Sequence, residues 1–194
     1  MKNFPFYAVF ALVSAISSSS AYAVDEVETL FKFDGGIGSQ PLRAGPAVNL
    51  IAGVNPGGAA WVIGALKADI KTNGEINAKV KGVLLGGTDN VGTRGGARKM
   101  VISLFCRNAP VPPAVAGTLQ TVSYDSEFVD LDPNGDFQVG GSLTNASGAT
   151  PPADCGDKVD NRPVLLIRTV TPANPTTGTR AAPGNWFAAG ILKD

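Results

Sequence analysis

The sequence predicts a single all-β domain, either an antiparallel sandwich or an open barrel, with long loops and few helices. Three observations predict this class. Short segments alternate apolar and polar residues with a period of two, which is typical of strands with one buried and one solvated face. Loops rich in glycine and proline separate these segments, and the 194 residues include 24 glycines and 14 prolines. No segment has the capped 3.6-residue periodicity that indicates a helix.

Residues 1–23 have the three parts of a secretory signal peptide, and we expect them to be removed. Lys2 precedes an uncharged apolar stretch, Phe4 to Ile16, and the small residues of Ala21-Tyr22-Ala23 suit the signal peptidase. The apolar stretch is shorter than the roughly 18–20 residues of a membrane span, so we expect no transmembrane anchor after cleavage. Residues 24–194 then form one secreted or periplasmic domain.

Charge and composition exclude several classes of function. The chain has 16 basic and 16 acidic residues, and Lys2 is the one charge of the leader, so the mature chain is nearly neutral. This balance argues against a nucleic-acid partner, which needs a basic patch. The chain contains no histidine, and this removes the usual general base and the commonest metal ligand.

The two cysteines, Cys106 and Cys155, suit an exported protein. An even number of cysteines outside the cytosol favours a disulfide. In the chain-entropy model, closing a loop of about 50 residues stabilises the fold by roughly 4 kcal/mol. A reactive thiol is the alternative, but the chain offers no histidine to activate it.

The clearest strand signal is a hairpin over residues 65–81. Apolar and polar residues alternate on both sides of Thr72-Asn73-Gly74. Directly opposed residues share a face, so Ile70 must pair with Ile76, which leaves a three-residue loop. Such a loop is typically a type I turn followed by a left-handed residue, and Gly74 occupies that position.

The same construction recurs over residues 128–139. Pairing Leu131 with Phe137 again leaves a three-residue loop, Pro133–Gly135, whose last residue is glycine. Val164–Ile167 is continuously apolar, which predicts a strand buried on both faces. Other strands are expected at 27–33, 99–105, 118–124, 164–170 and 186–192. Two further strand-like pieces are expected on either side of a turn at 54–58, and irregular loops are expected at 109–117, 143–160 and 171–185.

The stretch Asp130 to Gly135 matches the first half of a calcium-binding loop, and with Asp136 it makes Asp130, Asp132 and Asp136 candidate calcium ligands. The second half fails, because the twelfth position is Gly141 and not a bidentate glutamate. The predicted register places Asp132 opposite Asp136, and a bound calcium ion would relieve the repulsion between them. The alternative is a solvated turn whose aspartates point into water.

A glycine-rich loop over residues 85–99 ends in three cations, of which Arg94 and Arg98 could bind an anionic group such as a phosphate or an acidic sugar. The loop lacks the ending of a phosphate-binding P-loop, and no helix follows it. The alternative is a flexible connection with exposed arginines.

Carboxylate pairs are the remaining apparatus for acid–base catalysis. Asp125 and Glu127 are two residues apart and would share one face of a strand. With Asp130 nearby, they could form an acid/base pair of the kind that glycosidases use, although surface carboxylates are the simpler interpretation. Three aromatic residues either form a sugar-stacking platform or fill the core, and the alanines and glycine beside them favour the core: Trp61, Trp186 and Phe187.

Four segments resemble small exported bacterial proteins that have no assigned activity: Val80–Gly87, Ser103–Cys106, Pro163–Arg168 and Trp186–Ile191. The layout also resembles the extracellular CHRD domain, a β module that typically carries histidines on a central strand. This chain has no histidine, so any property that depends on them is not carried over. The resemblance implies an exported β domain and no particular chemistry.

The leading hypothesis is therefore a non-catalytic exported β domain, an envelope or secreted interaction module whose partner is a protein or a glycan. The alternatives are a carboxylate-based enzyme acting on carbohydrate and a calcium-stabilised, adhesin-like module. No cofactor is expected apart from calcium.

Overall fold

The computed structural model describes residues 27–41, 49–107, 122–156 and 161–193, and this part of the chain is built from β-strands without an α-helix. One antiparallel sheet of nine strands has the order β7-β6-β10-β11-β1-β3-β4-β9, with β8 also paired to β6, and β2 and β5 form a small second sheet. The strands are β1 (Thr29–Gly38), β2 (Trp61–Val62), β3 (Ala65–Lys71), β4 (Glu75–Lys81), β5 (Leu84–Leu85), β6 (Lys99–Phe105), β7 (Tyr124–Asp125), β8 (Val129–Asp130), β9 (Phe137–Ser142), β10 (Val164–Thr171) and β11 (Ala182–Leu192).

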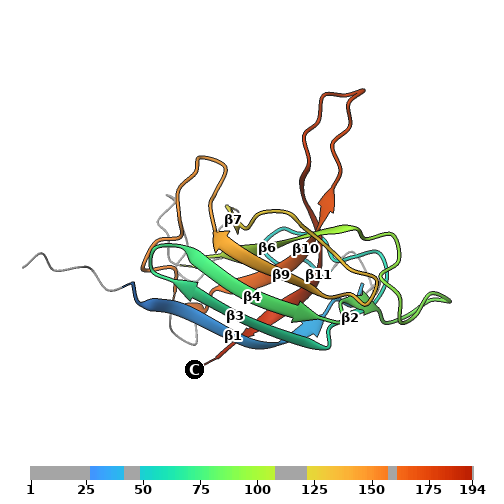
Figure 1. Ribbon diagram of the computed structural model, residues 1–194, viewed down its shortest axis with the longest axis horizontal. Coiled ribbons are helices and arrows are strands. Elements are labelled where there is room, and N and C mark those ends of the chain that lie inside the picture. Colours follow the sequence, from blue (N-terminus) through green and yellow to red (C-terminus); the bar gives the residue numbers. More distant parts are fainter. Residues whose placement is uncertain (1–26, 42–48, 108–121, 157–160, 194) are drawn as a thin grey trace, which may run out of the picture.

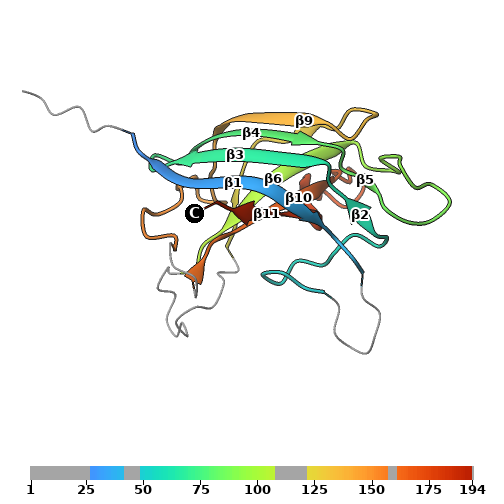
Figure 2. The ribbon, with the colours of Figure 1, turned by 90° about the horizontal axis from the view of Figure 1, so that it is seen from below.

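The large sheet curls into a half-barrel, with β1, β3, β4 and β9 arching over β6, β10 and β11 (Figures 1 and 2). The all-β class is thus confirmed, and of the two expected architectures the structure has the open barrel. The expected leader, residues 1–23, lies outside the described residues.

The first predicted hairpin forms in the expected register. Ile70 of β3 pairs with Ile76 of β4, and Gly74 has the left-handed φ of 84° that the three-residue turn requires. Side chains of both strands alternate between buried and more exposed positions, so the apolar ones enter the curl.

The second predicted hairpin is wrong in its strand pairing. The turn itself is present, because Gly135 has a φ of 79° and the Asp132 N–H donates to the Asp136 carbonyl at 3.1 Å. However, β8 pairs with β6 and β9 pairs with β4, so the two arms diverge. Each arm covers an edge of the sheet that would otherwise remain unpaired.

The two ends of the curled sheet meet again beyond β9. Asp125 of β7 and Thr144 exchange two backbone hydrogen bonds, of 2.8 and 3.0 Å. The turn at Pro133–Gly135 and this bridge therefore join the ends of the half-barrel on either side of β9.

The main hydrophobic core fills the inside of the curl. Its largest fully buried side chains include those of Phe33, Leu66, Ile70, Ile102 and Leu165. Trp61 and Phe187 belong to this core and stack on each other, with ring centroids 3.8 Å apart and an interplanar angle of 11°.

A second, smaller core lies on the outer face of β6, β10 and β11, where Phe105, Leu166 and Trp186 pack together. A loop over residues 49–57 covers them, because its backbone binds Trp186: the indole Nε1 donates to the Asn49 carbonyl at 3.2 Å, and the Gly57 N–H donates to the Trp186 carbonyl at 2.8 Å. β10 is thus buried on both faces, as its continuous apolar run predicts.

Some predicted boundaries differ from the structure. β6 has the expected limits, but β11 begins at Ala182, inside the expected loop at 171–185, and Asn174 bridges to Thr179. This hairpin extension projects into solvent (Figure 1), so apolar alternation could not indicate it. The turn expected at 54–58 lies at Ile51–Val54, and residues 109–117 and 118–121 lie outside the described part of the chain.

Candidate functional site

The predicted disulfide is present between Cys106 and Cys155, whose Cα atoms are 4.5 Å apart. It links the end of β6 to the loop that follows β9, and both cysteines are fully buried. Disulfides of this kind persist in proteins that are kept outside the reducing cytosol.

The three aspartates proposed to bind calcium each have a protein partner. The Asp132 Oδ1 accepts the N–H groups of Asn134 and Asp136 at 2.8 and 2.9 Å, and the Asp136 Oδ1 accepts the Gly82 N–H at 2.8 Å. Asp130 forms an ion pair of 2.9 Å with Lys99. Among the described residues no group of three or more acidic or cysteine side chains is arranged to hold a metal ion. The calcium site therefore stays a prediction.

The glycine-rich loop is tied to the same turn through its arginines. The Arg94 guanidinium donates to the Leu131 carbonyl, and the Leu131 N–H donates to the Arg98 carbonyl at 2.8 Å. The Arg98 side chain bonds back to the carbonyls of Gly95 and Ala97, each at 3.0 Å. These bonds give both arginines a structural role, and anion binding by them stays a prediction.

The aromatic residues Trp61, Trp186 and Phe187 are 5%, 2% and 7% exposed, so their rings are not available to stack on a sugar. Their interpretation as core residues is confirmed. A sugar-binding surface must therefore use other residues.

The most distinctive polar cluster lies on the outer face of the sheet, where β7, β6 and β10 are neighbours. Ser103 of β6 donates from its Oγ to the Asp125 Oδ1 at 2.5 Å, and Ser123 donates to the Asp125 Oδ2 at 2.9 Å. Arg168 of β10 donates from NH1 to the Ser103 Oγ at 3.3 Å. We call these four residues the Arg168 cluster.

The Arg168 guanidinium also holds the base of the projecting hairpin. Its Nε donates to the Gly184 carbonyl at 2.8 Å and its NH2 to the Pro183 carbonyl at 2.9 Å. Burial lowers the pKa of Arg168, and the Asp125 carboxylate acts in the opposite direction by favouring the charged form. The side chain is half-buried and stays protonated at neutral pH.

Three of the four cluster residues line an open depression of about 390 Å³. Arg168, Asp125 and Ser123 supply its polar groups, and Val54 and Pro183 supply apolar ones. The depression therefore offers a donor, an acceptor and an apolar wall side by side, which is the usual composition of a site for a small polar ligand.

The sequence singled out Asp125 for a different role. Its expected partner Glu127 is exposed, and the Ser126 between them is buried with its hydroxyl bonded to the Ile102 N–H at 3.0 Å. Ser103 and Arg168 were not identified as site residues. The sequence did contain a signal for both. Ser103 lies within an apolar run and Arg168 directly follows one, and both side chains are on the face opposite the main core.

No family model matches the chain, and the searches of curated proteins and of solved structures found no match. In the described part of the chain, no helix has the length and hydrophobicity needed to cross a membrane.

Proposed function

We propose that this protein is an exported, non-catalytic β domain that binds a glycan in the depression around Arg168. The predicted signal peptide at residues 1–23 and the disulfide between Cys106 and Cys155 support export. The resemblance to small exported bacterial proteins agrees with this proposal. The observation that carries the binding site is the Arg168 cluster, because charged side chains are costly to bury on an otherwise apolar face.

The chemistry of the cluster suits the hydroxyl groups of a sugar. A guanidinium has five N–H donors, and Arg168 uses three of them in bonds to described residues, so two can serve a ligand. The Asp125 carboxylate has room for further donors beside Ser103 and Ser123. Adjacent hydroxyls can then accept from Arg168 and donate to Asp125, while Val54 and Pro183 contact the C–H face of the ring.

A carboxylate-based hydrolase fits this depression less well. Glycosidases need two carboxyl groups about 5–10 Å apart, one on each side of the scissile bond. Among the described residues that line the depression, Asp125 is the one carboxylate. Binding is therefore the function that this geometry favours.

A glycan array probed with the mature protein tests the proposal, followed by calorimetric titration of the best ligand. Arg168→Lys keeps the charge but loses the planar fork of donors, and we expect its Kd to rise about tenfold or more. Asp125→Asn keeps the shape and removes the anionic acceptor, and it should weaken binding similarly. Arg180→Lys, on the exposed hairpin, is the matched control and should bind normally.

Each variant is first compared with the wild-type protein by circular dichroism and thermal unfolding. The proposal is overturned if the wild-type protein binds no glycan. It is also overturned if folded Arg168→Lys and Asp125→Asn variants both bind as tightly as the Arg180→Lys control.

A further inference from the structure

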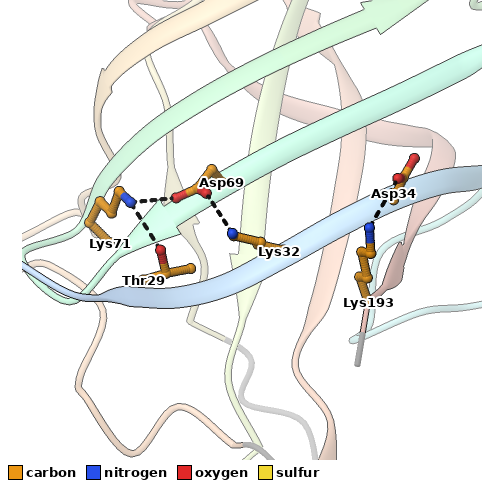
Figure 3. A network of polar contacts seen from close by, with 6 residues as sticks. All are labelled: Thr29, Lys32, Asp34, Asp69, Lys71 and Lys193. Atoms are coloured by element: carbon orange, nitrogen blue, oxygen red, sulfur yellow. Dashed lines mark hydrogen bonds and ion pairs between the residues drawn. The ribbon is translucent and has the colours of Figure 1, made fainter.

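The outer face of β1, β3 and β4 carries rows of charged side chains that surround a second open depression, of about 560 Å³. Part of this surface is neutralised by ion pairs (Figure 3). Asp69 lies 3.1 Å from Lys71 and 3.9 Å from Lys32, and Asp34 lies 3.8 Å from Lys193. Lys71 also donates to the Thr29 hydroxyl at 2.9 Å.

Three lysines on the same face have no acidic partner among the described residues. Lys67 of β3 is directly opposite Lys79 of β4, and Lys81 follows two residues along β4 on the same face. Asp34 is opposite Lys67 on β1, but its carboxylate pairs with Lys193 instead. We call Lys67, Lys79 and Lys81 the basic corner.

The basic corner is a costly arrangement in the protein alone. Like charges in directly opposed positions of an antiparallel pair destabilise the sheet. Asp34, Asp69 and Glu75 on the same face offset part of this repulsion, and a bound anion would relieve the rest, so an anionic ligand suits this corner.

The side chains beside the basic corner indicate which anion. Gln138 of β9 is directly opposite Lys79, and Asn77 lies two residues before Lys79 on the same face, and both are exposed. Gly140, opposite Asn77, leaves open space above the sheet. Amide groups bind sugar hydroxyls, whereas a membrane-binding surface places aromatic or aliphatic side chains beside its lysines.

We propose that the basic corner binds an acidic polysaccharide, with the lysines on its carboxylate or sulfate groups and the amides of Asn77 and Gln138 on its hydroxyls. This site is independent of the Arg168 cluster, because β11 and β1 separate β10 from β3 in the sheet. Either site can therefore fail without affecting the other.

The test uses polygalacturonate and dextran sulfate as probes, with neutral dextran for comparison. We expect the full mature protein to bind both acidic polymers with an affinity that falls as salt is raised, and not to bind dextran. The double variant Lys67→Gln/Lys79→Gln should weaken binding at least tenfold. It should unfold at the same or a slightly higher temperature than the wild-type protein, because it removes a repulsion.

Lys99→Gln/Arg180→Gln is the matched control, since it also removes two exposed positive charges, both from other parts of the molecule, and should change the affinity by less than twofold. The proposal is overturned if the control weakens binding as much as Lys67→Gln/Lys79→Gln does, because binding would then follow net charge alone. It is also overturned if no acidic polymer binds at low salt, or if vesicles of phosphatidylglycerol bind while the polymers do not.

Discussion

The turns at Thr72–Gly74 and Pro133–Gly135 have the same local structure but connect very different arms. Both end in a left-handed glycine, with φ of 84° and 79°. In both, a side chain accepts backbone N–H groups: the Asn73 Oδ1 binds the N–H of Glu75, and the Asp132 Oδ1 binds two N–H groups. The first turn nevertheless joins two paired strands, whereas the arms of the second belong to opposite ends of the sheet.

The difference teaches that a turn is determined by a few residues but a strand's partner depends on which edges are free. Leu131 and Phe137 are both buried in the main core, as they would be in a simple hairpin. The Leu131 N–H instead donates to the Arg98 carbonyl directly before β6, and Phe137 pairs with Val80 of β4. The two arms thus cover edges that a simple hairpin would have left unpaired. The apolar face of each arm is therefore the same in both arrangements, and the edges decide between them.

Removal of the disulfide should have the largest effect on stability, and it should affect the first turn more than the second. Leu143 donates from its N–H to the Gly74 carbonyl at 2.9 Å, and the loop that it begins is attached to β6 through Cys155. Replacing both Cys106 and Cys155 by alanine should lower the free energy of unfolding by about 4 kcal/mol, measured in urea.

Hydrogen exchange then locates the damage. The amides of Leu143 and Gly74 should exchange faster through local opening, whereas that of Gly135 should follow only global unfolding. Faster local exchange at Gly135 than at Gly74 would contradict the view that the disulfide supports the first turn.

Gly135→Ala should be the more damaging of the two glycine substitutions. A Cβ on Gly135 would lie 2.6 Å from the Val83 carbonyl oxygen and 2.7 Å from its nitrogen, and neither backbone atom can move easily. A Cβ on Gly74 would meet the side chain of Thr150 on a surface loop. We expect losses of about 3 kcal/mol for Gly135→Ala and about 1–2 kcal/mol for Gly74→Ala in urea unfolding. Equal losses would mean that backbone conformation alone sets the cost at both turns.

These two turns also show how far the sequence can predict the fold. The geometry of these two turns, the buried faces of β3 and β4 and the disulfide follow from local patterns or from composition, and these were predicted. The partners of β8 and β9 were not, because they depend on the order of strands distant in the chain.

The candidate site was harder to predict for the same reason. Ser103, Asp125 and Arg168 come together because β7, β6 and β10 are neighbours, and no local pattern of residues indicates that order. Alternation along one strand can place a side chain on a face, but it cannot name the side chain that will lie beside it.

The side chains that accept hydrogen bonds at the two turns should differ in their contribution to stability, by less than the two glycines do. Asp132→Ala removes an acceptor that binds two backbone N–H groups, and it should cost about 1–2 kcal/mol. Asn73→Ala removes an acceptor that binds one backbone N–H group, at 2.9 Å, and should lower the free energy of unfolding by about 0.5–1 kcal/mol. Asp132→Asn is the control, because its amide oxygen can still accept both bonds. A larger loss for Asn73→Ala than for Asp132→Ala in urea unfolding would argue against this account.

The smallest expected effect tests what selects the partner of β8. Asp130 of β8 is opposite Lys99 of β6, and their ion pair of 2.9 Å has side chains that are 83% and 52% exposed. Exposed pairs of this kind contribute about 0–1 kcal/mol, so Asp130→Asn should change the free energy of unfolding by about 0.5 kcal/mol or less, and 0.5 M salt should remove the difference. A loss of about 2 kcal/mol would mean that this ion pair, and not the free backbone edge of β6, holds the arm of the second turn away from β9.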